Sequence, residues 1–278
     1  MWGVTHPDHE PVPTFQQCIS KARQPLRARL EAVVPTVGAA AQAFETAAAT
    51  GQLHTVLQTT AVGTVTTAEM KDVYTTRMVP AKSPGRSVYD QIFALAGNRC
   101  PMCMHREVRT LDHFLPKAHY TILSVTPLNL VPCCTDCNKA KGDDAPATAE
   151  EVTMHPYFDA FDEDLWLKAE VLESQPAAVQ FFVDAPAYWN PTTKARADAH
   201  FNTFKLADLY ASQAANDLSG IRGELETLHV SAGDHGVEEH LAERALSWSR
   251  HHLNCWQAAM YTAMSQSQWF CSGGFRLE

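Results

Sequence analysis

Two pairs of closely spaced cysteines constrain the fold of this chain more than any other feature. They are Cys100-Pro-Met-Cys103 and Cys134-Thr-Asp-Cys137, and 30 residues lie between them. Each pair forms a tight turn whose two sulfurs can occupy adjacent corners of a zinc tetrahedron. We therefore expect Cys100, Cys103, Cys134 and Cys137 to bind one structural Zn²⁺ that closes the base of the intervening segment.

Three other interpretations of these cysteines compete with the zinc site. Cys133 adjoins Cys134 and can compete with it, but its CxxxC spacing to Cys137 matches the first pair less well. Four buried thiols without a metal are a second alternative. A redox-active pair is a third, but it needs a βαβ pattern that neither pair has around it. The remaining cysteines lie in helical patterns and are expected in the core: Cys18, Cys255 and Cys271.

Charge is distributed unevenly along the chain. The net charge is −9, yet residues 71–142 contain ten Lys and Arg against five Asp and Glu. A basic stretch in an acidic chain suits a protein whose phosphate contacts are confined to one site. There is no apolar run long enough to span a membrane and no secretory signal, so we expect a cytoplasmic protein without membrane contact.

The segment between and just after the cysteine pairs is predicted to form two strands and a helix. Residues 108–113 can be a strand, 128–131 the returning strand, and 135–141 a helix that opens at the second cysteine pair. This order would bring together four polar residues that are distant in sequence: Asp112, His113, Asn129 and Asn138.

These residue types match what the hydrolysis of a phosphodiester requires. Asp112 and Asn138 offer oxygen ligands for a hard divalent ion, Mg²⁺ or Mn²⁺. His113 has the intrinsic pKa of a general base, and Asn129 can orient its imidazole. Because Asp112 and His113 are neighbours on a strand, a strand end or bulge is needed for both to reach one phosphate. Four basic residues are expected to contact the nucleic-acid backbone: Arg109, Lys117, Lys139 and Lys141.

The string DHFLPK, followed by NLVPCCTDCNKAKGD, resembles the HNH endonuclease family in its zinc-stabilised branch. The resemblance covers about 45 residues. It implies a ββα-metal finger with one catalytic Mg²⁺ or a substitute, with Asp112 and Asn138 as its ligands, His113 as general base and Asn129 as the central Asn. Asn138 stands where the family's second His would be, which favours Mg²⁺ or Mn²⁺ over softer ions.

The leading functional hypothesis is a metal-dependent endonuclease that acts on DNA. The alternatives are a self-sufficient restriction-type nuclease and a non-catalytic zinc module that binds nucleic acid or a partner. The layout is similar to HNH nucleases encoded beside ATPases in bacterial anti-phage loci. That similarity implies antiviral defence, with an ATPase or another partner docking on the helical regions.

The fold class predicted from the pattern is α+β and predominantly helical, with a ββα-metal finger and its zinc site embedded in helical flanks. Three regions are expected: a helical region 1–80, the nuclease core 81–145, and a mainly helical region 146–278 with a small hairpin. A capping box at Thr66–Glu69 should open a helix through Met78. The other expected helices are 14–30, 37–49, 87–96, 192–204, 206–228 and 237–270, and the hairpin strands are 166–173 and 178–183.

Overall fold

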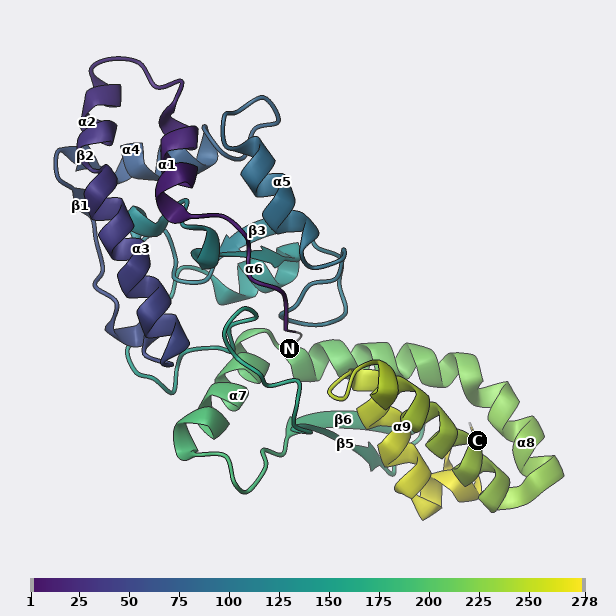
Figure 1. Cartoon of the computed structure of the whole chain (residues 1–278). Helices are drawn as coiled ribbons and strands as arrows, with labels where there is room; N and C mark the ends of the chain where they lie inside the picture. Colours follow the sequence, from purple (N-terminus) through teal and green to yellow (C-terminus); the bar gives the residue numbers. More distant parts are fainter. Residues whose placement is uncertain (1–2, 277–278) are drawn as a thin grey trace. The chain divides into compact units, whose positions relative to one another are not determined.

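The structure, a computed structural model, describes residues 3–276 and contains two compact units. The first ends at Asp159 and the second begins at Ala160. Helices dominate both, and every sheet has two strands, so the predicted helix-rich α+β class is confirmed (Figure 1). The division into three regions stays a prediction. By packing, residues 3–80 lie in the same unit as residues 81–145, the predicted nuclease core. Within residues 3–276 no helix is both long and apolar enough to cross a membrane.

The first unit opens with three helices: α1 (Pro11–Ile19), α2 (Leu26–Ala32) and α3 (Val34–Ala49). The single helix expected over residues 14–30 is therefore wrong. Pro25 interrupts it, because proline has no N–H to donate to the preceding turn, and α2 begins directly after it. The stretch over residues 52–65 contains little regular strand. It contains a 3₁₀ turn, η1 (Leu53–Thr55), and the short pair β1 (Ala61–Val62) and β2 (Val65–Thr66).

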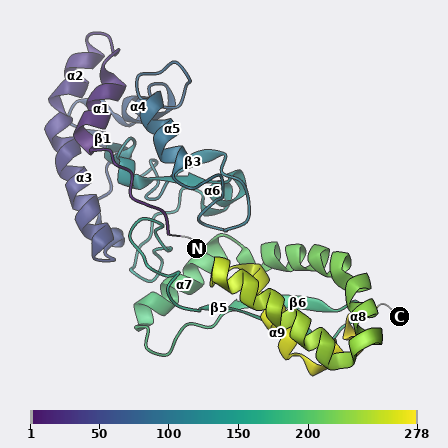
Figure 2. The same cartoon turned by 45° about the vertical axis from the view of Figure 1, so that its right-hand side comes forward.

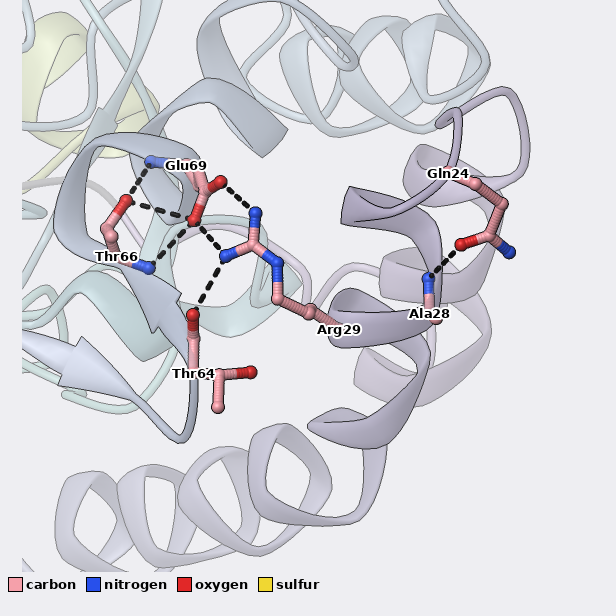
Figure 3. A network of polar contacts seen from close by, with 6 residues as sticks. All are labelled: Gln24, Ala28, Arg29, Thr64, Thr66 and Glu69. Atoms are coloured by element: carbon pink, nitrogen blue, oxygen red, sulfur yellow. Dashed lines mark hydrogen bonds and ion pairs between the residues drawn. The ribbon is translucent and has the colours of Figure 1, made fainter.

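Helix α4 (Thr67–Thr75) begins at the predicted capping box and ends before the predicted Met78. Thr66 accepts from the backbone N–H of Glu69, and Glu69 accepts from the backbone N–H of Thr66 at 3.0 Å. Arg29 of α2 then joins this cap: its guanidinium donates to Glu69 Oε2 and to the carbonyl oxygen of Thr64, both at 2.8 Å (Figure 3). The Arg29–Glu69 pair thus ties α2 to the start of α4.

The predicted strand–strand–helix order is confirmed for residues 108–141. Strand β3 (Thr110–His113) pairs antiparallel with β4 (Leu130–Cys133), in a register that sets His113 opposite Leu130. Helix α6 spans Thr135–Lys141, as predicted. Strand β4 starts two residues later than expected because a 3₁₀ turn, η3 (Pro127–Asn129), precedes it. Two further elements complete this part: helix α5 (Arg86–Ala94) and the turn η2 (Thr121–Leu123).

The second unit is built on the predicted hairpin. Strands β5 (Leu167–Leu172) and β6 (Ala178–Val183) pair antiparallel, and α7 (Pro191–Thr203) follows them. Helix α8 (Leu206–His251) is broken between the predicted segments 206–228 and 237–270, as expected. It turns back at Gly233, whose φ of 68° breaks the helix (Figure 2).

The segment predicted as one helix over 237–270 is divided between the end of α8 and the final helix of the second unit, α9 (Trp256–Gln266). The chain is not helical between His251 and Trp256, where the buried Asn254 side chain bonds the start of β5. Its carboxamide oxygen accepts from the backbone N–H groups of Trp166 and Leu167 at 2.9 and 3.1 Å. A short π turn, η4 (Phe270–Gly274), follows α9.

Candidate metal centre and active site

The four predicted cysteine ligands meet in one buried cluster. The sulfur atoms of Cys100, Cys103, Cys134 and Cys137 all lie within 4.8 Å of one another. Around a tetrahedral zinc ion with Zn–S bonds of about 2.3 Å, neighbouring sulfurs would be about 3.8 Å apart. The cluster is therefore a four-cysteine metal-binding site that is compatible with structural Zn²⁺.

Cys133 is not one of these four cysteines, as the spacing predicts, although its thiol interacts with those of Cys100, Cys134 and Cys137. It is the last residue of β4, and its neighbour Cys134 is the N-cap of α6, where Cys134 Sγ accepts from the backbone N–H of Cys137 at 3.3 Å. Beside the cluster, Arg106 pairs with Asp136 at 2.8 Å and interacts electrostatically with three of the cysteines. Its positive charge offsets part of the negative charge of a four-thiolate site. Cys18, Cys255 and Cys271 are buried in the core, as expected.

A cavity of about 350 Å³ lies over the end of β3 and the exposed side of α6. Polar side chains from three segments of the first unit reach it. Its lining comprises Tyr74, Thr110, Leu111, Asp112, His113, Pro116, Lys117, Asn138, Lys139, Gly142 and Asp143. Three of the four polar residues that the sequence brings together therefore face one space: Asp112, His113 and Asn138.

The imidazole of His113 is held by a hydrogen bond at one of its two ring nitrogens. Its Nε2 lies 2.8 Å from the carbonyl oxygen of Ser124, so Nε2 carries the proton and Nδ1 keeps its lone pair. The ring is 3% exposed. Burial, with a further contribution from the Lys117 charge, lowers the pKa of His113 to about 3. The imidazole is therefore neutral near pH 7 and able to accept a proton.

Asp112 reaches the same cavity as His113 because β3 ends there. Its carboxylate folds back onto the backbone of the next residue, where Oδ1 accepts from the N–H of His113 at 2.8 Å. Asn138 of α6 also donates to Oδ1, at 3.1 Å, and the Lys141 ammonium lies 3.2 Å from Oδ2. Burial raises the pKa of Asp112, and the Lys141 charge opposes that shift. The strand end that the sequence argument required is present.

Asn129 has a different role from the one expected of it. Its side chain does not bond the imidazole; it accepts from the backbone N–H of Leu115 at 2.8 Å and donates to the carbonyl oxygen of Leu115 at 3.0 Å. A longer bond, 3.4 Å, goes to the carbonyl oxygen of Leu123. Asn129 is fully buried and fixes the loop that leaves β3. The Ser124 carbonyl supplies the contact that was expected of Asn129.

The four predicted phosphate-binding residues separate into two groups. Lys117 and Lys139 line the cavity, and Lys117 also lies 5.5 Å above the Tyr74 ring. Arg109 lies outside the cavity lining and forms an ion pair with Glu107. Lys141 is buried against Asp112. Its contact with the nucleic-acid backbone stays a prediction.

Sequence reasoning missed Tyr74, which comes from the N-terminal region. Its hydroxyl donates to the carbonyl oxygen of Leu111 at 2.9 Å, and the hydroxyl of Tyr89 accepts from the Leu111 N–H at 3.3 Å. The two tyrosines hold both backbone groups of the residue before Asp112. An apolar position on an amphipathic helix carries no sequence signal for such a contact, and neither does a backbone carbonyl such as that of Ser124.

Fold and site together define a helix-rich α+β protein with a four-cysteine metal-binding cluster. Over 198 residues the chain is 33% identical to Protein ea31 of Escherichia phage lambda, and the match covers 67% of each protein. The chain belongs to the family of this phage protein. No protein-family model matches the chain, and no solved structure matches it.

Proposed function

We propose that the chain is a metal-dependent endonuclease of the HNH type that hydrolyses phosphodiester bonds in DNA. The observation that carries the proposal is the meeting of a neutral imidazole, a carboxylate and a carboxamide at one cavity. On this proposal, β3, β4 and α6 are a ββα-metal finger, and zinc bound by the four cysteines closes its base.

His113 would act as the general base through Nδ1. The bond from Nε2 to the Ser124 carbonyl fixes the tautomer, so the lone pair of Nδ1 is free to take a proton from the attacking water. The lowered pKa of His113, about 3, keeps the imidazole neutral near pH 7 but makes it a weaker base than an ordinary histidine. Tyr74 packs against the ring and restricts its orientation.

Asp112 and Asn138 fit a hard divalent ion. In the structure the carboxamide nitrogen of Asn138 donates to Asp112 Oδ1 at 3.1 Å, so the carboxamide would turn over to present its oxygen to an ion beside Asp112. These two residues would hold the ion through oxygen atoms, and water and phosphate would complete its coordination. When bound, Mg²⁺ or Mn²⁺ supplies Lewis-acid stabilisation of the charge that develops on the phosphate.

The positive charge around the cavity favours a polyanionic substrate. Lys117 and Lys139 both line the cavity. They lie within the basic stretch of an otherwise acidic chain, so phosphate contacts would be concentrated at this site.

Plasmid cleavage tests the proposal. The wild-type chain and His113→Ala are incubated with supercoiled DNA, with and without Mg²⁺ or Mn²⁺. We expect nicking or linearisation by the wild type only when the divalent ion is present, and a loss of at least about a hundredfold in His113→Ala. Equal, ion-dependent cleavage by His113→Ala would contradict the assigned mechanism.

One observation favours a second candidate, a zinc module that binds nucleic acid without cutting it. Both carboxylate oxygens of Asp112 already have partners within the protein: Asn138 on Oδ1 and Lys141 near Oδ2. In such a module this network would be structural. Binding to DNA that needs no divalent ion, together with no cleavage over several substrates and ions, would favour this function over the nuclease.

We propose that a partner docked on the helical regions directs the chain to its target, whichever of the two functions it has. The hypothesis of an anti-phage locus with a neighbouring ATPase rests on the resemblance alone, and the relative identified here is itself a phage protein. Purification of the chain from its native host as a stoichiometric complex with an ATPase would support the hypothesis. Full and specific cleavage by the isolated chain would contradict it and favour a self-sufficient restriction-type nuclease.

A further inference from the structure

Lys141, the last residue of α6, is charged and buried. Its side chain is 8% exposed, and the Asp112 side chain that it faces is 11% exposed. The ammonium nitrogen lies 3.2 Å from Asp112 Oδ2 and donates to the carbonyl oxygen of His113 at 2.8 Å. One nitrogen atom therefore contacts both residues of the Asp-His pair.

The Asp112 carboxylate requires a positive charge beside it. A buried carboxylate is costly unless a cation or strong hydrogen bonds compensate for its lost hydration. Neutral N–H groups from His113 and Asn138 serve Oδ1, whereas Oδ2 faces the Lys141 ammonium. The protein itself thus supplies a cation to the group that the proposed function assigns to a divalent ion.

Lys139 provides an internal comparison. It carries the same charge on the same helix, two residues earlier, and it lines the same cavity. It is exposed to solvent, however, whereas Lys141 is buried. Water screens an exposed charge, so Lys139 should act on a cation at Asp112 much more weakly than Lys141 does.

We propose that Lys141 is an internal competitor of the divalent ion for Asp112. Its ammonium neutralises the carboxylate in the metal-free protein and repels an incoming cation at short range. Lys141 thereby sets the concentration of Mg²⁺ or Mn²⁺ at which the site fills, and keeps the site unfilled at low free metal. The inference rests on the proposed function in taking Asp112 as a metal ligand.

Mn²⁺ binding by the zinc-loaded full chain tests the inference independently of cleavage. Free Mn²⁺ is followed by its electron paramagnetic resonance signal in a titration near pH 8. We expect Lys141→Met to bind Mn²⁺ about tenfold more tightly than the wild type, because a buried positive charge next to the ligand is gone. The matched control Lys139→Met should stay within about twofold of the wild type.

Two further variants trace the effect to charge and to Asp112. Lys141→Arg keeps the charge and should leave the Kd for Mn²⁺ close to that of the wild type. Adding Asp112→Asn to Lys141→Met should abolish the tighter binding. Zinc content and thermal unfolding report whether each variant folds; if Lys141→Met does not, Lys141→Gln takes its place, since it retains an N–H donor without the charge.

The outcomes separate this inference from the proposed function. An unchanged or weaker Kd in a folded Lys141→Met or Lys141→Gln protein overturns the inference, as does the absence of Mn²⁺ binding in every variant. If Mn²⁺ binding shifts as expected and plasmid DNA is never cut, the inference stands and the nuclease proposal fails. If DNA is cut by a protein whose Kd does not depend on Lys141, the reverse holds.

Discussion

The ring of Tyr74, on α4, meets the imidazole of His113, at the end of β3, edge to face with ring centroids 4.5 Å apart. The hydroxyl of the same tyrosine donates to the carbonyl oxygen of Leu111. The N-terminal helices therefore contribute directly to the candidate site rather than forming a separate module. A chain cut near residue 80 would lose one wall of the cavity.

Tyr74→Phe is expected to lower the free energy of unfolding by about 1–2 kcal/mol, because the buried Leu111 carbonyl loses its hydrogen bond while the ring stays. Tyr74→Ala should cost more, about 3–5 kcal/mol, because it also leaves a cavity beside His113. Urea denaturation measures both. The exposed neighbour Thr75→Ala is the control and should change stability by less than about 0.5 kcal/mol. A Phe variant as stable as the wild type would show that the bond contributes nothing.

Cys134→Ala should remove the bound metal, whereas Cys133→Ala should not. The two cysteines are adjacent and both are buried, but only Cys134 belongs to the four-sulfur cluster. We expect zinc stoichiometry, measured by atomic absorption, to fall towards zero in Cys134→Ala and to stay near one per chain in Cys133→Ala. Loss of zinc from Cys133→Ala would mean that the CxxxC pairing is used after all.

Asn129→Ala should mainly lower stability, whereas Asn138→Ala should mainly weaken Mn²⁺ binding. Asn129 is fully buried and bonds three backbone groups, so its removal is expected to cost about 2–4 kcal/mol of stability. Asn138 is half-buried and bonds only Asp112, so its removal should cost about 1 kcal/mol or less and mainly weaken Mn²⁺ binding. Denaturation and Mn²⁺ titration of both variants check this, and similar profiles for the two would contradict the roles assigned here.

Glu69→Gln should reduce the loss of stability in acid. The hydrogen bond from Arg29 lowers the pKa of Glu69 from 4.5 to about 2. Because the folded-state pKa is the lower one, the contribution of Glu69 is complete above about pH 4.5 and is lost as the pH falls towards 2. Between about pH 5 and pH 3 the wild type should therefore lose more stability than Glu69→Gln does. Any zinc loss in acid should affect both proteins equally, so the measurement is the difference between their urea midpoints at each pH. A difference that stays constant with pH would contradict the assigned role of the Arg29–Glu69 pair.

Sequence reasoning succeeded where the determinants are local. The CxxC spacings identified all four cysteines, and the capping box placed the start of α4. Helix α6 was predicted to the residue because Cys134 caps its beginning and Gly142, with a φ of 62°, ends it.

Tertiary relationships were beyond that reasoning. A lysine near the end of a polar helix is usually exposed, and nothing local shows that Lys141 turns inward to Asp112. Asn129 was expected to orient the His113 imidazole because it lies on the facing strand. Its side chain instead bonds backbone groups of the loop from Leu115 to Leu123. The break in the last helix was missed because it depends on Asn254 bonding the distant β5.

Cys134 belongs to the metal cluster and is also the first capping group of α6, where its sulfur accepts from the backbone N–H of Cys137. The same seven-residue helix carries Asn138 and Lys139 to the cavity and Lys141 to Asp112. Oxidants that join these thiols, or chelators that withdraw their metal, would thus loosen the helix from its base. Such agents would therefore weaken the proposed chemistry without binding in the cavity itself.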